Sequence, residues 1–224
     1  MIVLEIVKVS LRMEAYIESI YRLEKKIGLA RTSDLAEDLN VALGSITNTL
    51  VSLEKKGLVI RKPYRGAKLT EKGRRIALDV IRKRRLSECF MADVLKMDWS
   101  NVYKPAGRFA QYLPDEIIKP LEKVLGHPQT CPHGNPIPTK CGGILEEESE
   151  PLTELNPNES GIIIKITEEK PRTLRHLAKM GLTPRALVKV EKKDSSKGLI
   201  ILKVQGIKHN LPKEIASIIR VKKC

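Results

Sequence analysis

The apolar residues of this chain follow two different spacings. Between Arg12 and Leu125 most of them recur at intervals of three and four residues, as on one face of an α-helix, whereas from Gly161 onward they alternate with polar residues, as along a β-strand. Residues 126–158, which separate the two regions, are rich in proline, glycine and acidic side chains. We therefore expect an α+β protein in which a linker joins a helical part to a β part.

The first 73 residues carry the element order of a winged helix-turn-helix. Helical spacing and stop signals predict helices over residues 12–27, 32–39 and 45–56. Two short runs, 58–61 and 67–70, flank a turn that contains Pro63 and Gly66, and they predict a two-stranded wing. Residues 1–73 are thus expected to form a DNA-binding domain.

The next segment, residues 74–140, is expected to form a helical dimerisation domain. A long helix is predicted over 71–95, and shorter helices over 99–112 and 115–125. The last of these is more apolar than so short a helix can bury alone, which indicates an antiparallel interface with a second copy, and packing on its own winged helix is the alternative. The expected interface residues are Val102, Phe109, Ile117, Ile118, Leu121 and Leu125.

An acidic, proline-rich linker is predicted over 141–160, and a small β-barrel over 161–224, which one helix at about 173–180 interrupts. The formal net charge of +14 is unevenly distributed. Residues 161–224 hold 16 Lys and Arg against five Asp and Glu, whereas residues 127–160 hold one against six. Basic regions on both sides of an acidic connector suit a polyanionic partner, although the lysine-rich surface of a heat-adapted protein would also raise the isoelectric point.

The third predicted helix has the two faces that a reading helix needs in the major groove of double-stranded DNA. Ile46, Leu50 and Leu53 form an apolar stripe, and short polar side chains face away from it, unless that face is simply solvated. An Asn in this place can bond the N6 and N7 atoms of adenine together. Basic and hydroxyl groups before the second helix and on the wing suit the DNA backbone. The predicted DNA-binding residues are Arg31, Thr32, Ser33, Ser45, Thr47, Asn48, Ser52, Arg61, Lys62, Tyr64, Arg65 and Lys68.

Other classes of protein are disfavoured. No apolar run approaches the ~20 residues that span a bilayer, and the first residues lack the pattern of a secretion signal, so we expect a cytoplasmic protein without a membrane partner. The sequence holds no nucleophile elbow, phosphate-binding glycine loop or His-Glu-x-x-His motif, so we do not expect an enzyme. An architectural DNA-binding protein is the alternative from another class.

Several stretches resemble the diphtheria-toxin-repressor-like metalloregulators. They are Glu14 to Tyr21, Asp34 to Glu37, Leu53 to Val59, Leu69 to Gly73 and His133 to Pro138. The last part of the chain resembles the FeoA-type SH3-like domain, through Leu152 to Leu155, Gly161, Met180 to Pro184 and Gly206 to Leu211. The resemblance implies a winged helix, dimerisation helices and an SH3-like barrel, in a homodimer that binds a palindromic operator, as a repressor, when it holds a divalent metal.

The chain departs from that family at the positions of its metal ligands. Where the family has donor side chains, this sequence has Ala15, Arg84, Tyr103, Gly107, Ala110 and Gln111, and the acidic position one turn after Arg84 remains as Glu88. Gly and Ala offer no donor atom, and Arg repels a cation. We therefore expect the family's sites to hold no metal and no cofactor to be required, with an Arg84–Glu88 ion pair in its place.

Cys131, His133 and Cys141 leave several alternatives open. Three soft donors within eleven residues suit zinc, iron or an iron–sulfur cluster, and the two cysteines can also pair as a disulfide. A structural or incidental role is equally compatible with the spacing. A metal- or redox-responsive regulator that uses these three residues is therefore the alternative to a regulator without a cofactor.

Overall fold

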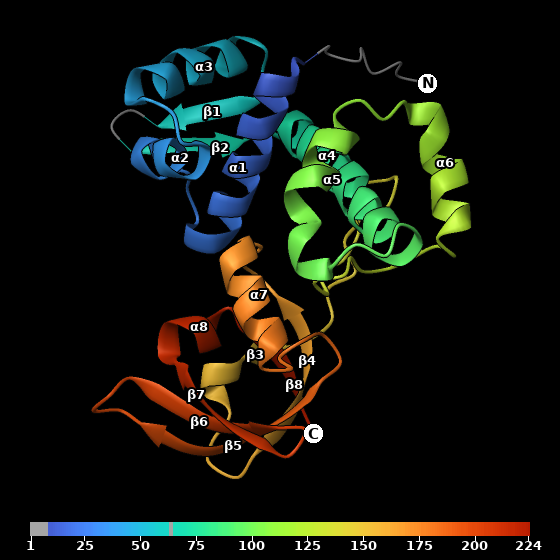
Figure 1. Ribbon diagram of the computed structural model, residues 1–224. Coiled ribbons are helices and arrows are strands. Elements are labelled where there is room, and N and C mark those ends of the chain that lie inside the picture. Colours follow the sequence, from blue (N-terminus) through green and yellow to red (C-terminus); the bar gives the residue numbers. More distant parts are fainter. Residues whose placement is uncertain (1–8, 63–64) are drawn as a thin grey trace. The chain divides into compact units, whose positions relative to one another are not determined.

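The computed structural model describes residues 9–62 and 65–224, so the predicted DNA contact Tyr64 lies outside the described residues. The chain forms two compact units (Figure 1). The first unit extends to Arg82 and includes Pro138–Gly143, and the second comprises Lys83–Ile137 and Ile144–Cys224. Each unit is described separately below.

The first unit is the winged helix-turn-helix expected from the sequence. Its elements are α1 (Leu11–Ile27), α2 (Thr32–Leu39), α3 (Leu43–Lys55), β1 (Val59–Lys62), β2 (Gly66–Leu69) and the first part of α4 (Glu71–Cys89). Ser10 caps the start of α1 by accepting a hydrogen bond from the Met13 N–H, and Gly28 ends the helix in the left-handed conformation. Strands β1 and β2 pair antiparallel, with Val59 opposite Leu69 and Lys62 opposite Gly66.

The second unit begins with the end of α4 and three further helices. The long helix predicted to Leu95 leaves the α-form at Cys89 and continues as a π-helical turn, η1 (Phe90–Val94), in which the Leu95 N–H donates to the Phe90 carbonyl. The helix predicted over 99–112 is divided into η2 (Trp99–Asn101) and α5 (Tyr103–Ala110). Pro105 favours this division, because it has no N–H to donate to the Asn101 carbonyl and so weakens a helix that would continue through this point. The last helix is α6 (Asp115–Val124).

A six-stranded antiparallel sheet forms the rest of the second unit, in the order β3-β8-β4-β5-β6-β7. Its strands are β3 (Glu150–Pro151), β4 (Ser160–Ile166), β5 (Leu187–Asp194), β6 (Leu199–Val204), β7 (Ile207–Pro212) and β8 (Ile219–Lys223). Short helices lie between them: η3 (Leu152–Glu154), α7 (Pro171–Lys179) and α8 (Lys213–Ser217). Figure 1 shows α7 and α8 beside the sheet. The expected fold class, a winged helix with dimerisation helices and a small SH3-like β domain, is confirmed.

The β domain begins earlier than the boundary at residue 161 that the sequence suggested. Leu152 and Leu155, which belong to the predicted linker, are fully buried in the core of this domain together with Ile163 and Val221. The acidic side chains of residues 146–150 are typical of a solvated linker and gave no sign of a strand. Strand β3 nevertheless forms here, because it pairs with β8 through its backbone. Among the described residues, no helix combines the length and the apolar character needed to cross a bilayer.

Candidate metal centre and DNA-reading helix

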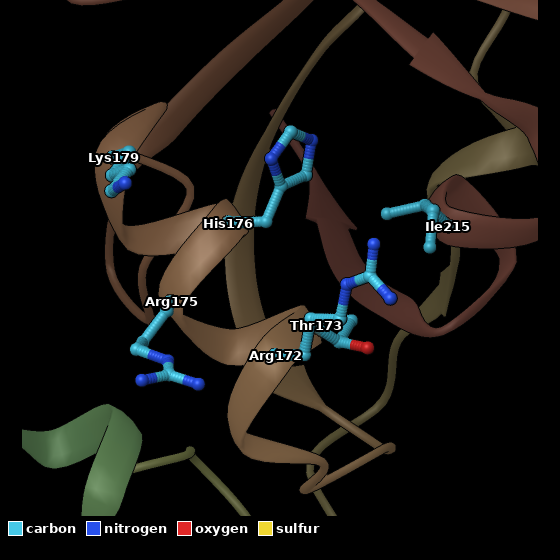
Figure 2. Close-up of a pocket in the computed structure, with 6 residues that line it drawn as sticks. All are labelled: Arg172, Thr173, Arg175, His176, Lys179 and Ile215. Atoms are coloured by element: carbon cyan, nitrogen blue, oxygen red, sulfur yellow. The ribbon is translucent and has the colours of Figure 1, made fainter.

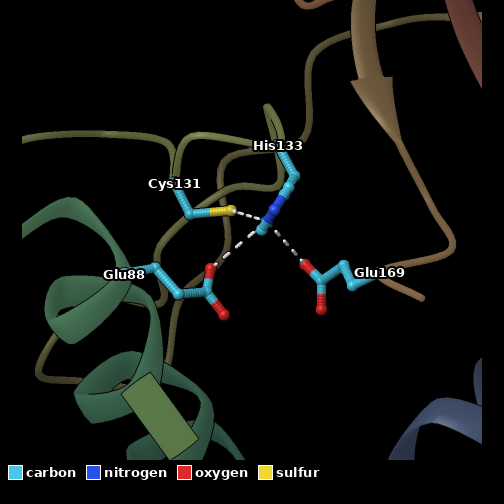
Figure 3. A group of neighbouring side chains, drawn as sticks. All are labelled: Glu88, Cys131, His133 and Glu169. Carbon is cyan, nitrogen blue, oxygen red and sulfur yellow. Dashed lines mark hydrogen bonds and ion pairs between the residues drawn. The ribbon is translucent and has the colours of Figure 1, made fainter. Parts of the chain in front are cut away.

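Four side chains with metal-binding atoms meet inside the second unit (Figure 3). Glu88 comes from the last turn of α4, Cys131 and His133 from the loop after α6, and Glu169 from the segment between β4 and α7. One candidate ligand atom from each side chain lies within 4.8 Å of the others. The first and the last of these residues, Glu88 and Glu169, are separated by 81 positions in the sequence, so only the fold brings the four together.

His133 is held so that one ring nitrogen faces the other three residues. Its Nε2 lies 2.9 Å from the carbonyl oxygen of Trp99, which fixes Nε2 as the donor. Its Nδ1 lies 3.5 Å from Oε2 of Glu88, 3.6 Å from Oε1 of Glu169 and 3.7 Å from Sγ of Cys131. A backbone carbonyl on the far nitrogen is the usual partner of a histidine that binds a metal through the near one.

The carboxylates of this group are buried and short of partners. The side chain of Glu88 is fully buried, and neither of its oxygens has a hydrogen bond within the described part of the chain. A buried carboxylate without hydrogen bonds is costly unless a cation lies beside it. The Asn135 amide donates to Oε1 of Glu169 at 3.0 Å and so orients that carboxylate toward His133.

The group already carries charge before any metal is considered. Burial opposes a charge on His133, but the neighbouring Cys131, Glu169 and Glu88 outweigh burial and raise the pKa of His133 to about 12. Burial likewise opposes ionisation of Glu169, and Arg84 and His133 overcome it and lower the pKa of Glu169 to about 2. Burial raises the pKa of the Cys131 thiol. A proton on Nδ1 of His133 therefore occupies the place where a metal ion would bind.

Arg84 lies against the same two carboxylates. Its Nε is 3.4 Å from Oε1 of Glu88, and one terminal nitrogen is 3.7 Å from Oε2 of Glu169. The guanidinium also lies over the ring of Tyr103, 4.5 Å from its centroid. The ion pair that the sequence suggested between Arg84 and Glu88 is thus present, but it lies beside a set of four donors that sequence reasoning had not assembled.

The loop that carries Cys131 and His133 depends on Gly134. The Gly134 N–H donates to the Cys131 carbonyl, and the His133 carbonyl accepts from the Ile166 N–H of β4, both at 2.9 Å or less. Gly134 has a φ of 81°, and a Cβ atom there would lie 2.0 Å from the Ile164 carbonyl oxygen. Only glycine allows the loop to approach β4 so closely.

We expect Gly134→Ala to destabilise the chain by more than about 3 kcal/mol, because the clash with Ile164 adds to the roughly 1–2 kcal/mol cost of the left-handed conformation. Urea unfolding measures the change. Gly126→Ala is the matched control, since Gly126 has a φ of 70° but no neighbouring atom within 4 Å of the added Cβ. Equal losses in the two variants would contradict the close approach as the reason for Gly134.

Helix α3 carries the predicted reading residues on one face. Ile46, Leu50 and Leu53 are buried, whereas Thr47 and Asn48 are exposed. Ser45 and Ser52 are half-buried, and the Ser45 hydroxyl accepts a hydrogen bond from Arg12 of α1. Asn48 is therefore the exposed amide on this face. Of the other predicted contacts, Arg31, Ser33, Lys62 and Arg65 are exposed, and Thr32 and Lys68 are half-buried.

Several basic residues of the wing and of α4 form ion pairs or hydrogen bonds within the chain. Arg61 forms an ion pair with Glu54, with Nε and Oε2 2.6 Å apart, which ties the wing to α3. On α4, Arg82 donates to the Pro138 carbonyl, Lys83 pairs with Asp115, and Arg85 donates to the Pro136 carbonyl. The run of four cations from Arg82 to Arg85 thus secures internal contacts.

The residues expected at a dimer interface divide into three groups by their burial. Val102 is fully buried beside Met91 and Ala106, and Leu121 lies in a core with Leu86 and Cys89, so these two pack within their own protomer. Ile118 and Leu125 are half-buried against the second of these cores. Phe109 and Ile117 are exposed. The apolar side chains of this segment that are exposed are Val94, Leu95, Phe109, Tyr112, Ile117 and Val124.

Three family models together match most of the chain. They are the iron dependent repressor N-terminal DNA binding domain at residues 8–67, the iron dependent repressor metal binding and dimerisation domain at residues 70–139, and the FeoA domain at residues 150–223. The chain belongs to the iron-dependent repressor family. Glu88, Cys131 and His133 lie in the second matched region of the family, and Glu169 lies in the third.

Individual relatives match over almost the whole length. The iron-dependent repressor IdeR of Mycobacterium leprae is 31% identical and that of Mycobacterium tuberculosis 30% identical, each over 94% of this chain and 96% of the relative. Among solved structures, a manganese-dependent transcriptional repressor in complex with manganese has a TM-score of 0.89 at 25% identity and covers 95% of this chain and 100% of its own. The IdeR of T. acidophilum has a TM-score of 0.82 at 28% identity, over 98% and 100%.

These findings correct the expectation that no cofactor is required. Members of this repressor family are named for their dependence on iron or manganese, and this chain holds a buried group of four donors. The expectation was wrong because it considered only the positions at which the resembled family has metal ligands, and the four donors of this group do not all lie at those positions. Glu169 was missed, since nothing in the sequence separates it from the neighbouring Glu168.

Cys141, which the sequence grouped with Cys131 and His133, is not part of this set. Cys131 is buried and Cys141 is exposed, and both are free thiols, as are Cys89 and Cys224. The disulfide considered between Cys131 and Cys141 is not formed in this structure. The two soft donors of the candidate centre are therefore one thiol and one imidazole.

Proposed function

We propose that this chain is a transcriptional repressor that binds operator DNA as a homodimer when a divalent first-row metal ion, iron(II) or manganese(II), binds at Glu88, Cys131, His133 and Glu169. The observation that carries the proposal is the buried group of four donors in a chain of the iron-dependent repressor family. One thiol, one imidazole and two carboxylates suit a first-row transition ion better than calcium or magnesium, which prefer oxygen ligands alone.

Each of the four residues has a distinct part in this proposal. His133 would present Nδ1 because the Trp99 carbonyl holds its Nε2–H. Glu88 would present oxygens that lack hydrogen bonds, and Glu169 would present one that Asn135 orients. A bound divalent ion would take the place of the proton on His133 Nδ1 and add positive charge beside two carboxylates that Arg84 already contacts. The four donors would then fasten the end of α4, the Cys131–Gly134 loop and the segment after β4 to one another.

A second copy of the chain is the proposed partner of the exposed apolar side chains on the helical segment. Phe109 and Ile117 lie there with Val94, Leu95, Tyr112 and Val124, and the matched family region is one of dimerisation as well as metal binding. Val102 and Leu121 are not part of this proposed surface, because they are buried in their own protomer. Two copies would present two α3 helices, as a palindromic operator requires.

The function is tested by measuring DNA binding of the full chain under reducing conditions without oxygen. Genomic fragments are selected with the metal-loaded protein, and the affinity for a recovered fragment is then measured after chelation and after addition of Fe²⁺, Mn²⁺ or Zn²⁺. We expect discrete fragments and an affinity that falls about 5- to 150-fold on chelation, the usual range of coupling between two sites. Equal affinity of chelated and loaded protein would refute activation by metal.

Arg84 gives a second test of the same centre. Its guanidinium competes with a cation for Glu88 and Glu169, so Arg84→Met should raise metal affinity about tenfold or more, because a repulsive charge is removed at close range. Competition with a chelator of known affinity measures the change. Arg108→Met, on the exposed surface of α5, is the matched control and should leave metal affinity unchanged. Unchanged or weaker affinity in the Arg84 variant would contradict the competition.

A further inference from the structure

Helix α7 of the β domain presents a basic face that the metal centre does not use. Arg172, Arg175, His176 and Lys179 have the spacing i, i+3, i+4, i+7, which places them on one side of the helix, whereas Leu174 and Leu177 are buried on the other. All four basic residues are exposed. With Thr173 and with Ile215 of α8 they line a hollow of about 570 Å³ that has no carboxylate in its wall (Figure 2).

The stability of α7 does not account for this face. Cations in the last turn of a helix, such as His176 and Lys179, interact well with the helix dipole, but Arg172 lies in the first turn, where a cation is unfavourable. The first turn of α7 contains no acidic residue. Four cationic or titratable groups within about two turns of one helix also repel each other. A stabilising partner outside the helix would explain why they lie together.

Carboxylates of the same unit neutralise other cations of the β domain, and Glu168, which does contact α7, accepts a hydrogen bond from Thr173 and pairs with Lys170 outside the basic face. Lys165 pairs with Glu146 at 2.5 Å, Lys222 with Glu147 at 3.1 Å and Lys208 with Glu191 at 2.7 Å. The acidic segment before β3 is therefore engaged with β4 and β8. Within the described residues, neither Arg172 nor Lys179 has a carboxylate oxygen within 4 Å, and Arg175 has only a weaker interaction with Asp98.

The side chains diverge instead of meeting at a single point. In Figure 2, the side chains of Arg172 and His176 point toward Ile215, whereas those of Arg175 and Lys179 point away from it. A site for one small anion requires groups that converge on it. A row of cations along about 10 Å of helix, at 1.5 Å per residue, fits a partner that carries a series of charges. One strand of duplex DNA supplies a charge about every 3.4 Å along its axis.

We propose that the basic face of α7 binds the phosphate backbone of double-stranded DNA, independently of base sequence. The β domain then contributes to repressor–DNA affinity in addition to α3 and the wing, and this proposal rests on the proposed function of the chain as a DNA-binding repressor. Guanidinium and ammonium groups neutralise phosphates and release counterions, so the contribution depends on salt and not on the operator sequence.

The test compares the full metal-loaded chain with the variant Arg172→Gln, Arg175→Gln, Lys179→Gln on a duplex of mixed sequence a few helical turns long. The slope of log affinity against log salt is measured between about 50 and 200 mM. The slope falls by about 0.9 for each phosphate that the protein no longer neutralises, so we expect a decrease of about 2.7 per protomer. The difference in affinity between the two proteins should shrink as salt rises, which a folding defect would not produce.

The control variant carries Lys189→Gln, Lys192→Gln and Lys203→Gln, which remove the same charge from exposed positions on β5 and β6. An unchanged slope in the α7 variant, or an equal decrease in the control, would overturn the proposal. Binding of inorganic phosphate that disappears in the α7 variant, with an unchanged DNA slope, would also overturn it and indicate a small-anion site. Measurements with and without metal keep the two proposals apart, because failure of metal activation leaves the slope difference intact.

Discussion

Replacing Glu88 with glutamine is expected to remove most of the stabilisation that metal gives to this repressor. The substitution keeps the volume of the side chain but takes the negative charge from Glu88, whose side chain is fully buried in the group of four donors. Mutation of a residue that hydrogen-bonds to a metal ligand typically lowers metal affinity 10- to 100-fold. Loss of a ligand itself should therefore lower metal affinity about 100-fold or more. At a metal concentration 100 times its dissociation constant the wild-type chain gains about 2.7 kcal/mol, and the variant should gain less than about 0.5 kcal/mol.

The measurement is the difference in unfolding free energy with and without Fe²⁺ or Mn²⁺, taken for each protein against its own metal-free form. This cancels any effect of the substitution on the metal-free chain. Glu116→Gln is the matched control, because Glu116 is exposed on α6 in the same unit. A variant at Glu88 that retains the full metal-dependent gain would exclude this carboxylate as a ligand.

Replacing Asn48 with alanine should weaken operator recognition selectively. Asn48 is the exposed amide on α3, and an Asn that bonds adenine through two hydrogen bonds provides about 1–3 kcal/mol of discrimination. We expect operator affinity to fall by about 5- to 150-fold, with little change on DNA of unrelated sequence. Fluorescence anisotropy with both duplexes measures the two affinities.

Lys68→Ala on the wing provides the contrasting variant. Removal of a phosphate-binding group weakens binding to all sequences alike and lowers the salt slope by about 1, whereas removal of a base-reading group leaves the slope unchanged. Uniform weakening by Asn48→Ala on both duplexes would assign Asn48 to the backbone and leave the reading of bases to other residues of α3.

The winged helix could be predicted from the sequence because its signals are local. The spacing of Ile46, Leu50 and Leu53 indicated the buried face of α3, and these three residues are buried in the structure. Gly28 ends α1 in the left-handed conformation, as the stop signal predicted. Such features depend on residues within one or two helical turns of each other, so the spacing of neighbouring side chains is enough to reveal them.

The partners of the basic residues on α4 could not be predicted in this way. Arg82 and Arg85 donate to the carbonyls of Pro138 and Pro136, which lie more than 50 residues later. Four consecutive cations point around the helix, so the sequence indicates that they cannot all face DNA, but it does not indicate which backbone carbonyls they contact. These hydrogen bonds become evident only in the fold, where residues 136–138 lie alongside α4.

The candidate metal centre escaped prediction for a related reason. Cys131 and His133 were visible as soft donors, and Glu88 was visible as a retained acidic residue. Their meeting with Glu169 depends on the bond between the Ile166 N–H and the His133 carbonyl and on the approach of Gly134 to β4. Those are backbone contacts between residues at least 30 positions apart, and the spacing of side chains along the sequence does not predict them.

The origin of Glu169 has a thermodynamic consequence. Three of the four donors belong to the matched dimerisation domain, whereas Glu169 belongs to the FeoA domain. If an ion binds the four donors as proposed, its binding and the packing of the FeoA domain on the dimerisation domain are linked equilibria. The factor by which the bound ion strengthens this packing equals the factor by which the packing raises the affinity for the ion. A chain shortened before residue 150 would bind its ion more weakly through the loss of a ligand. If the four donors hold an ion as proposed, the affinity for that ion is a property of two domains together, and an event that loosens one of them would change it.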